Sequence, residues 1–321
     1  MLKTSRNKHA STVVVIPAFN VAKEIISVIE KIDESVTKII VVDDKCPQKS
    51  GKIVNQKCND KRLVVLFNDE NLGVGGSMLR GYREALRTNP TYVVKLDGDG
   101  QMDPNLIPIF INELESNGGD YAKGNRFADP ENLKLMPKIR ILGNLVLSFF
   151  AKFSTGYWNV FDPNNGFTVI RGDMLNQIPL EKISSGYFFE SDMLFRLNLI
   201  GAEVVDIPMK PIYGDEKSNL RISKSVFEFS LKHTKNFAKR IAYNYFMRDF
   251  NLASLELILA FNFLFLGTII GATNLIKAVQ TNSSMSVGLL VLVSILMISG
   301  LQLLLNFFNF DMNIGSRKNP R

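Results

Sequence analysis

Two long runs without any charged residue, near the C-terminus, constrain the fold of this 321-residue chain more than any other feature. They extend from Leu257 to Ile276 and from Val287 to Phe310. About 20 apolar residues in a helix are enough to cross the hydrocarbon core of a bilayer. The few polar side chains in the runs are of a kind that pairing between two spans tolerates. We therefore expect two transmembrane helices, with two buried core helices as the alternative.

Basic residues are concentrated on the outer flanks of these runs and account for much of the net charge of +7. Residues 217–248 are rich in lysine and arginine, with Glu228 as their lone acidic residue, and residues 316–321 are basic again. Lys277 is the only charged residue in the segment between the two runs. Because positive flanks stay on the cytoplasmic side, we expect both outer ends there, joined by a short hairpin through the membrane.

The remaining composition indicates a cytosolic domain attached to this hairpin. Residues 1–10 are polar and basic, and the apolar run at residues 13–16 is too short for a secretory signal. The protein is therefore expected to be a multi-pass protein of the cell (inner) membrane, with its main domain in the cytoplasm. The basic flanks suit membrane lipids with anionic headgroups or an anionic lipid substrate. Nucleic acid, the competing partner, is not expected beside membrane spans, and pairing of the spans in a homo-oligomer stays open.

Strand and helix patterns alternate through the first hundred residues. Buried strands are expected near residues 12–17, 38–44, 63–67 and 92–96, with helices at 22–32 and 77–87. This alternation predicts an α/β fold with a mostly parallel central sheet covered by helices on both faces. In such sheets, ligands bind at the carboxyl ends of the strands, and polar or glycine-rich residues follow these strands here.

The fourth predicted strand ends in a loop of carboxylates and glycines. Asp97, Asp99 and Asp103 alternate with glycines and with Gln101. Carboxylates at alternate positions of a tight loop can face one way and share a divalent cation, and oxygen ligands suit Mg²⁺ or Mn²⁺. An ordinary surface turn is the alternative. Asp103 is expected instead to cap the helix that Pro104 begins.

Two other strand ends carry weaker signals. The glycines from Gly73 to Gly76 open a helix, where backbone N–H groups can face an anion, although close helix packing explains them equally well. Asp44 follows the second strand and suits a ribose hydroxyl or a base edge, with a plain turn residue as the alternative.

Several motifs together resemble the inverting glycosyltransferases of family 2, which have the GT-A fold. They are the segments ending in Pro17-Ala18-Phe19-Asn20 and in Asp43-Asp44, together with Asn71–Gly76 and Asp97–Gln101. Residues 162–167, 205–208 and 213–218 resemble the polyprenyl-phosphate sugar transferases of that family, typified by dolichol-phosphate mannose synthase. The resemblance covers about residues 11–225.

The resemblance implies a donor site at the strand ends. Asp97, Asp99 and Gln101 would hold Mg²⁺ or Mn²⁺, which neutralises the leaving diphosphate as a Lewis acid. Asp44 would contact the nucleoside. The remaining donor and sugar contacts implied are Pro17, Phe19 and Asn20, which wall the base pocket, together with Gly73, Gly76 and Asn165.

The resemblance also implies residues for catalysis and for the acceptor. Arg126 matches an arginine expected near phosphates, where a guanidinium binds with two bonds. Glu190 and Asp192 precede a helix at the place of the family's base, and an already anionic lipid phosphate needs no strong base. They are assigned to acceptor positioning, sugar contacts or helix capping, with catalysis left open. The predicted contacts of the acceptor phosphate are Arg140, Asn144, Lys217 and Arg221.

Two segments have the pattern of amphipathic helices at a membrane surface, residues 139–153 and 225–248, with a core helix as the alternative for the first. We accordingly expect a cytoplasmic GT-A domain at 1–224, a juxtamembrane helix at 225–250, two spans within 251–310 and a basic tail at 311–321.

These features predict a metal-dependent inverting transferase. It would move a hexose from a nucleotide-diphosphate sugar, of the GDP-mannose or UDP-glucose type, to a polyprenyl phosphate at the cytoplasmic face. One alternative is a glycosyltransferase with a hydroxyl glycan acceptor. The other is a membrane-tethered scaffold that binds a sugar nucleotide without turnover.

Overall fold

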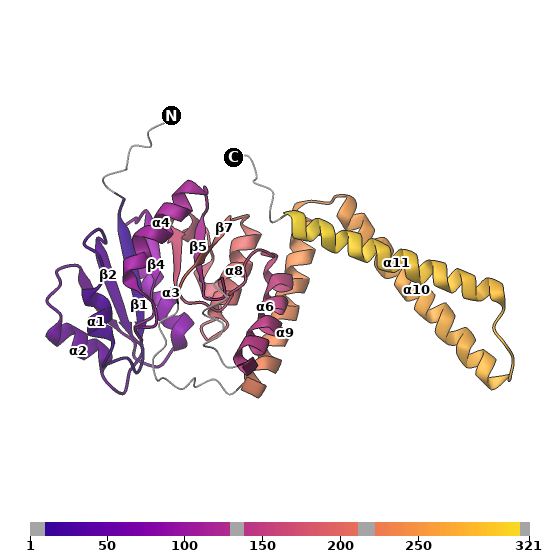
Figure 1. The fold of residues 1–321 in the computed structure, drawn as a ribbon, viewed down its shortest axis with the longest axis horizontal. Helices are drawn as coiled ribbons and strands as arrows, with labels where there is room; N and C mark the ends of the chain where they lie inside the picture. The colour runs from indigo at the N-terminus through magenta and orange to yellow at the C-terminus, as the bar shows by residue number, and fades with distance from the viewer. Residues whose placement is uncertain (1–9, 129–137, 211–221, 315–321) are drawn as a thin grey trace, which may run out of the picture. The chain divides into compact units, whose positions relative to one another are not determined.

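A computed structural model describes residues 10–128, 138–210 and 222–314 of the chain (Figure 1). The chain divides into two compact units, residues 1–237 and residues 238–321. The first unit contains a seven-stranded sheet with helices on both faces, and the second contains a pair of long apolar helices. We describe each unit by itself.

The strands of the first unit follow the sequence pattern closely. They are β1 (Thr12–Ala18), β2 (Lys38–Asp43), β3 (Leu63–Phe67), β4 (Tyr92–Lys95), β5 (Tyr121–Asn125), β6 (Thr168–Arg171) and β7 (Val204–Pro208). The helices include α1 (Ile25–Glu30), α2 (Ser50–Lys57), α3 (Gly73–Leu86), α4 (Ile107–Ser116), α6 (Lys138–Thr155), α7 (Gly172–Leu175), α8 (Phe189–Leu199) and α9 (Ile222–Ala242), which continues into the second unit. Helix α3 begins at the glycines themselves, four residues earlier than the sequence pattern predicts.

The sheet has the strand order β3-β2-β1-β4-β6-β5-β7. The mostly parallel sheet is confirmed, because only β6 runs antiparallel, to both of its neighbours. In this register Thr168 of β6 lies opposite Lys95 of β4 on one side and Lys123 of β5 on the other. Two lysines on interior strands therefore flank one threonine across the middle of the sheet.

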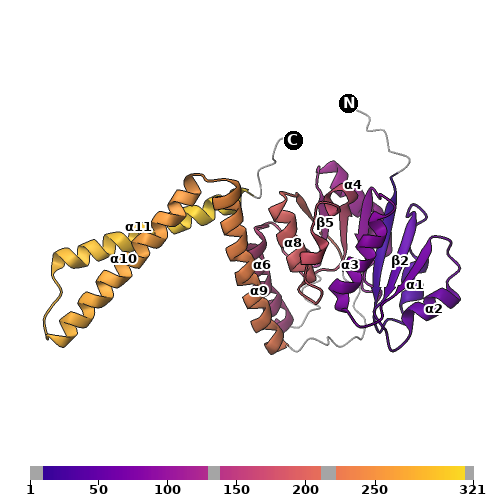
Figure 2. The same cartoon turned by 180° about the vertical axis from the view of Figure 1, so that it is seen from behind.

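Apolar side chains cover both faces of the sheet, as the alternation of strands and helices along the sequence predicts. On one face, α3 and α8 bury Met78, Tyr82, Phe189 and Met193 against β1, β2 and β4 (Figures 1 and 2). On the opposite face, α1, α2 and α4 supply a second cluster that includes Phe110, whose ring stacks on a phenylalanine just before β6. Helices α6 and α9 lie side by side in both views.

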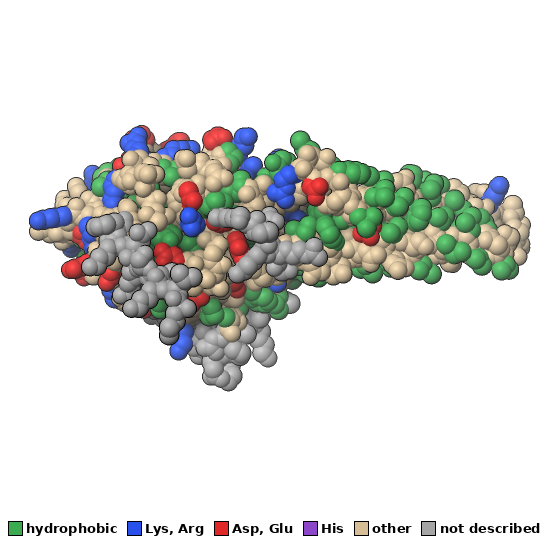
Figure 3. Space-filling model, turned by 90° about the horizontal axis from the view of Figure 1, so that it is seen from above, with side chains coloured by type: hydrophobic (Ala, Val, Ile, Leu, Met, Phe, Trp, Pro, Cys, Tyr) green, Lys and Arg blue, Asp and Glu red, His purple; other side chains and the backbone are tan. Residues whose placement is uncertain are grey.

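The second unit contains both predicted spans. Helix α10 (Leu252–Gln280) and helix α11 (Val287–Ile314) are long and apolar enough to cross a membrane. Only 17% and 6% of their most apolar windows are buried, which does not support two core helices. Gly267 and Gly300 let the two helices approach, since each packs against a side chain of the other helix. Hydrophobic side chains are widespread on the surface of this helix pair (Figure 3).

A buried ion pair joins the two ends of the second unit. Nη1 and Nη2 of Arg240 donate to Oδ1 and Oδ2 of Asp311 at 2.6 and 2.9 Å. The hydroxyl of Tyr245 donates to the same carboxylate at 2.7 Å, and the carbonyl of Tyr245 accepts from Ser254. Both side chains of the ion pair are 2% exposed. Such a pair must be complete, because one partner alone leaves a buried charge without compensation.

We predict that Asp311→Asn destabilises the full-length protein by roughly 3–5 kcal/mol, since it leaves the buried guanidinium of Arg240 without its counter-charge. The measurement is the apparent melting temperature in detergent. Glu228→Gln is the matched control, because it breaks an exposed ion pair with Lys232 and should cost less than about 1 kcal/mol. Equal effects of the two substitutions would contradict the role of the buried pair.

Candidate active site

Seven polar or glycine-containing segments meet at one edge of the sheet. The carboxyl ends of the parallel strands β1, β2, β3 and β4 lie at this edge, as do those of β5 and β7. The segment before β6 joins them, because β6 is antiparallel and begins where its neighbours end. This topology places Pro17–Asn20, Asp44, Asp97 and Asn165 along one edge of the sheet.

The ends of β1 and β2 form the region predicted for the nucleoside. The backbone N–H of Asp44 donates to the carbonyl of Ala18, and Asn20 N donates to the thiol of Cys46 at 3.1 Å. Asn20 has a left-handed backbone with φ 59°, which turns the chain away from the strand. The ring of Phe19 is 44% exposed. An exposed aromatic ring beside a strand end suits base stacking, and the nucleoside contacts stay a prediction.

Asp44 is buried and already holds the start of α3. Its Oδ1 accepts from Asn68 Nδ2 at 2.7 Å and from Leu72 N at 2.8 Å, while Oδ2 accepts from Gly73 N at 2.9 Å. A carboxylate oxygen accepts about two hydrogen bonds, so Oδ2 retains room for one more. Asp44 therefore shapes the glycine turn and leaves at most one strong contact for a ligand.

The glycine turn packs tightly against the chain before α8. Gly76 N donates to the carbonyl of Ser185 at 2.9 Å, and a Cβ on Gly75 would lie 2.5 Å from the carbonyl oxygen of Ser184. The N–H groups of Gly73 and Gly76 are thus used inside the protein. Close packing, one of the two explanations considered for these glycines, is what the structure shows, and their contact with substrate stays a prediction.

The loop after β4 carries the predicted metal ligands. The Asp97 side chain is 29% exposed and lies beside Lys95. Asp99 accepts from Gln101 N at 3.0 Å and lines a cavity of about 520 Å³ next to α1. Asp103 accepts from Asn105 N at the start of the Pro104 turn, so its predicted capping role is confirmed. Asp97 and Asp99 thus keep exposed or cavity-lining carboxylates, whereas Asp103 is used for the cap.

Lys95 is the buried cation behind this loop. Its Nζ lies 2.6 Å from Oδ1 of Asp97, 3.2 Å from Oε1 of Glu190 and 3.3 Å from the carbonyl of Gly166. Burial opposes the charge of Lys95, but the two carboxylates outweigh burial and raise the pKa of its ammonium. Gly166 permits this approach, because a Cβ there would collide with Asp97 and with the ammonium.

Glu190 and Asp192 both lie in the first turn of α8, not before the helix as the sequence pattern predicts, and they contact different partners. Glu190 is buried beside Lys95 and so belongs to the cluster at the end of β4. Asp192 accepts from Ser184 N at 2.8 Å and from Asn236 Nδ2 of α9 at 3.0 Å. Asp192 therefore ties α8 to α9, whereas Glu190 faces the predicted metal loop. Their functional roles stay predictions.

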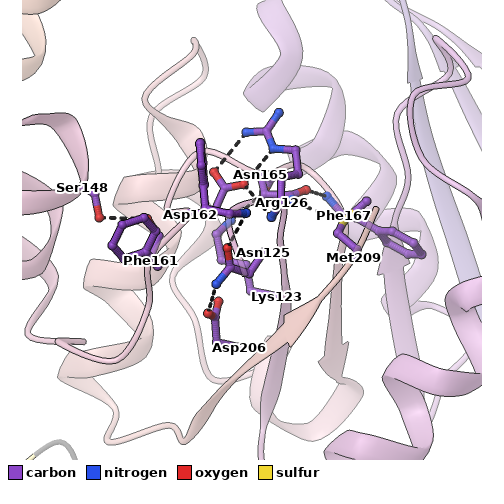
Figure 4. Close-up of polar contacts among 11 residues, drawn as sticks. Lys123, Asn125, Arg126, Ser148, Phe161, Asp162, Asn165, Phe167, Asp206 and Met209 are labelled. Atoms are coloured by element: carbon purple, nitrogen blue, oxygen red, sulfur yellow. Dashed lines mark hydrogen bonds and ion pairs between the residues drawn. The ribbon is translucent and has the colours of Figure 1, made fainter. Parts of the chain in front are cut away.

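Arg126 follows β5 and forms a bidentate ion pair with buried Asp162 (Figure 4). Nε and Nη2 of Arg126 donate to the two carboxylate oxygens of Asp162 at 2.7 and 3.0 Å. The arginine side chain is 22% exposed. Its contact with a phosphate stays a prediction.

Lys123 and Asn165 are buried next to this ion pair. Nζ of Lys123 donates to the carbonyl of Asn165 at 2.5 Å, and burial lowers the pKa of Lys123 to about 8. The amide oxygen of Asn165 accepts from Phe167 N at 2.9 Å, and its NH₂ contacts the sulfur of Met209. Asn165 is buried, so its predicted sugar contact would need its remaining hydrogen-bonding capacity.

Asp206 of β7 lies opposite Lys123 of β5. It accepts from Nδ2 of Asn125 at 2.6 Å, whereas its second oxygen is buried without a hydrogen-bond partner (Figure 4). Burial raises the pKa of Asp206 to about 6, although the bond from Asn125 opposes this shift. Asp206 is therefore a largely buried carboxylate with one unsatisfied oxygen close to the site, rather than a ligand at its surface.

The predicted acceptor residues are only partly described. Arg140 and Asn144 lie on α6, in a part of that helix whose side chains are outside the described residues. Lys217 and Arg221 lie outside the described residues altogether. On the described part of α6, Val146, Phe149 and Phe150 are exposed apolar side chains, as a membrane-facing helix requires.

Sequence reasoning missed Lys95 and Lys123 as members of the site. Each is the single charged residue within a short apolar strand, in Val93-Val94-Lys95 and Tyr121-Ala122-Lys123. A lysine at an interior strand position is costly unless it is paired. That cost was the signal available in the sequence, although the pairing partners come from distant segments.

The donor set at the end of β4 fits a hard divalent cation. Two carboxylates and an amide oxygen are the ligands that Mg²⁺ and Mn²⁺ prefer. Among the described residues, no group of three or more His, Cys, Asp or Glu side chains is placed to hold a metal. A site of Asp97, Asp99 and Gln101 would not form such a group, because its third ligand is an amide.

The sheet order, the antiparallel β6 and the acidic loop after β4 define a glycosyltransferase of the GT-A fold. The model of the family Glycosyl transferase family 2 matches residues 13–178, more than half of the chain, and the chain belongs to this family.

Similar proteins include three with named activities. The chain is 27% identical over 215 residues to the UDP-N-acetylglucosamine–dolichyl-phosphate N-acetylglucosaminyltransferase of Methanococcus voltae, which covers 63% of this chain and 85% of that protein. It is 25% identical to the polyprenol monophosphomannose synthase of Mycolicibacterium smegmatis, covering 62% of this chain and 76% of that protein. It is 26% identical to the undecaprenyl-phosphate mannosyltransferase of Micrococcus luteus, covering 61% and 81%.

Solved structures share the fold. Glucosyl-3-phosphoglycerate synthase from Mycobacterium tuberculosis, in complex with Mn²⁺, UDP and phosphoglyceric acid, superposes with a TM-score of 0.54. That match covers 72% of this chain and 78% of the other at 17% identity. Mannosyl-3-phosphoglycerate synthase from Rubrobacter xylanophilus gives the same TM-score and identity, covering 75% and 77%. At this identity the likeness concerns the fold alone.

We predict that Gly75→Ala destabilises the protein by about 1–3 kcal/mol, because the added Cβ meets the backbone of Ser184 and Ser185. Gly186→Ala is the control from the neighbouring loop, since a Cβ there meets nothing within 4 Å. It should change the stability by no more than about 0.5–1 kcal/mol. Melting temperatures of the two variants in detergent decide the point, and an unaffected Gly75→Ala variant would contradict the close packing.

Asp206→Asn is expected to stabilise the protein at pH 7.5. The folded state raises the pKa of this carboxyl to about 6, so the folded state binds the proton more tightly and loses stability as the pH rises from about 4 to 6. Asparagine keeps an acceptor for Asn125 and removes this penalty, which gains roughly 1–3 kcal/mol at pH 7.5 and nothing near pH 4.

The control is Asp173→Asn, at an exposed carboxyl whose pKa is lowered by its hydrogen bond with Arg171. This substitution should act in the opposite direction at neutral pH. Thermal unfolding measured from pH 4 to 8 separates the two variants. A gain from Asp206→Asn that does not depend on pH would contradict the titration argument.

Proposed function

We propose that the protein transfers a hexose from a nucleotide-diphosphate sugar to a polyprenyl phosphate at the cytoplasmic face of the cell membrane. The observation that carries this proposal is the loop Asp97–Gln101 at the shared edge of strand ends, in a chain that also has two helices able to cross a membrane. Its relatives named for dolichyl, polyprenol or undecaprenyl phosphate support this acceptor class.

The residues at the edge divide into a donor side and an acceptor side. On the donor side, Pro17–Asn20 and Asp44 would surround the nucleoside. Asp97, Asp99 and Gln101 would hold Mg²⁺ or Mn²⁺, which supplies positive charge to the leaving diphosphate when it is bound. On the acceptor side, the carboxylate Glu190 lies next to Lys95 and Asp97, and Arg126 follows β5, two strands from β4.

Inversion follows from attack opposite the leaving group. An oxygen of the lipid phosphate forms the bond to the anomeric carbon as the bond to the nucleoside diphosphate breaks, and that diphosphate keeps the electron pair. The acceptor oxygen is already anionic near neutral pH, since the second pKa of a phosphate monoester is about 6. The chain therefore needs cations and positioning on the acceptor side rather than a strong base.

The apolar helices support an acceptor that lies in the membrane. A polyprenyl chain remains in the bilayer, and its phosphate lies at the headgroup level. In the sequence, basic residues are concentrated on the outer flanks of the two apolar runs, where they suit anionic headgroups. We propose that the hairpin of α10 and α11 keeps the catalytic domain at that surface as an integral, multi-pass anchor. A hydroxyl glycan acceptor, or binding without turnover, is the remaining alternative.

The decisive experiment incubates membranes that contain the protein with radiolabelled GDP- and UDP-sugars and a polyprenyl phosphate. We expect a labelled lipid that is extracted into organic solvent and that disappears on chelation of divalent metal. Asp99→Ala should lower its formation by at least about 100-fold, since it removes a proposed metal ligand.

Asp103→Ala is the matched control from the same loop, because this carboxylate caps the Pro104 turn. It should lose about 1 kcal/mol of stability and keep its activity within a few-fold. Label in a water-soluble glycan would contradict the lipid acceptor. If no donor is turned over although a sugar nucleotide binds, the transferase proposal itself is wrong.

A further inference from the structure

One ammonium group lies between the proposed metal site and the carboxylate on the acceptor side. Lys95 is 1% exposed, and its three N–H groups have three partners, namely Asp97, Glu190 and the carbonyl of Gly166. The side chain of Glu190 is 10% exposed and that of Asp97 is 29% exposed. Both carboxylates thus contact one buried cation from different segments, Asp97 from the loop after β4 and Glu190 from α8.

This arrangement poses a chemical problem for a metal site. Glu190 is the same type of ligand as Asp97 and Asp99, and hard divalent cations take additional carboxylates readily. Glu190 and Asp97 both contact Nζ of Lys95, so a Glu190 side chain released from this ammonium would lie near the proposed metal ligand Asp97. In the structure, however, the described contacts of Glu190 are directed to the ammonium of Lys95.

We propose that Lys95 is a positioning residue that keeps Glu190 out of the ligand shell of the metal and holds it as a separate carboxylate facing the acceptor. This inference rests on the proposed function. In this proposal, one buried lysine separates a carboxylate that binds the metal from a carboxylate that faces the acceptor.

The charge count gives the proposal a measurable sign. Asp97 and Glu190 contribute two negative charges, and Lys95, which contacts both, reduces the net charge of this group to −1. Removing the ammonium takes away a cation that repels the metal and frees Glu190 to become a ligand. Both effects increase metal affinity, whereas simple damage to the site would decrease it.

Lys123 provides the comparison within the same sheet. It is also fully buried, and it lies two strands from Lys95 across Thr168. Its hydrogen bond goes to the carbonyl of Asn165, and it feels the charge of Glu190, but among the described contacts it makes no ion pair with Asp97 or Glu190. Loss of Lys123 therefore removes a buried lysine without removing the cation between Asp97 and Glu190.

The test measures Mn²⁺ binding to the detergent-solubilised full-length protein with saturating UDP or GDP, from the free Mn²⁺ signal in electron paramagnetic resonance. Lys95→Met should tighten Mn²⁺ binding about tenfold. Turnover of the labelled sugar should fall at least tenfold, with no rise in the KM for the donor. Glu190→Gln should weaken Mn²⁺ binding several-fold, and the double variant should return to near the wild-type affinity.

Lys123→Met is the control and should change Mn²⁺ affinity less than twofold. If Lys95→Met does not fold, Lys95→Gln takes its place, because glutamine keeps N–H donors for the two carboxylates and removes only the charge. The lysine substitution must tighten Mn²⁺ binding more when Glu190 is present than in the Glu190→Gln background, since only the wild-type carboxylate can become a ligand.

Unchanged or weaker Mn²⁺ binding after the lysine substitution, or equal tightening with and without Glu190, overturns the inference while leaving the proposed function intact if the wild type makes the labelled lipid. A wild-type protein that binds no Mn²⁺ with either nucleotide and turns over no donor overturns both.

Discussion

The antiparallel pairing of β6 between β4 and β5 is the constraint on which the site depends. It places Thr168 between Lys95 and Lys123, and it brings the segment before β6 back to the edge where the parallel strands end. Both lysines then bond to carbonyls of that segment, at Gly166 and Asn165. A parallel β6 would put this segment at the opposite edge of the sheet, and Lys95 and Lys123 would then lose these carbonyl partners.

Much of the fold could be predicted from local patterns. The first four strands and both apolar helices each lie within one stretch whose periodicity or length indicates its structure. The position of β6 could not be predicted in this way, because the strand has four residues and its partners come from segments more than 40 residues earlier. Likewise, α3 begins at its glycines because Asp44 bonds to Leu72 and Gly73, a tertiary contact that local propensity does not contain.

The site shows the same division between local and distant information. Motifs indicated Asp97, Asp99 and Asp44, whose positions at strand ends follow from the alternating pattern. The partner of each carboxylate could not be predicted from the sequence, because it lies in a distant segment. Asp44 holds the start of α3, Asp192 binds Asn236 of α9, and Glu190 contacts Lys95. Glu190 and Asp192 are two residues apart and looked equivalent in sequence. Their different partners separate them into a residue of the site edge and a residue of helix packing.

Two buried cation–carboxylate groups occur in the described chain, one in each unit, and neither is explained by stability alone. A buried ion pair gains little over apolar packing of the same volume, because both charges lose their water. Arg240 and Asp311 fix the ends of α9 and α11 to each other within the second unit. Apolar packing alone would not define the register between these two helices. Lys95 has two carboxylate partners instead of one. A cation shared in this way is poorly suited to a purely structural role, since either carboxylate alone would satisfy its charge, and it is well suited to holding two carboxylates apart for different tasks.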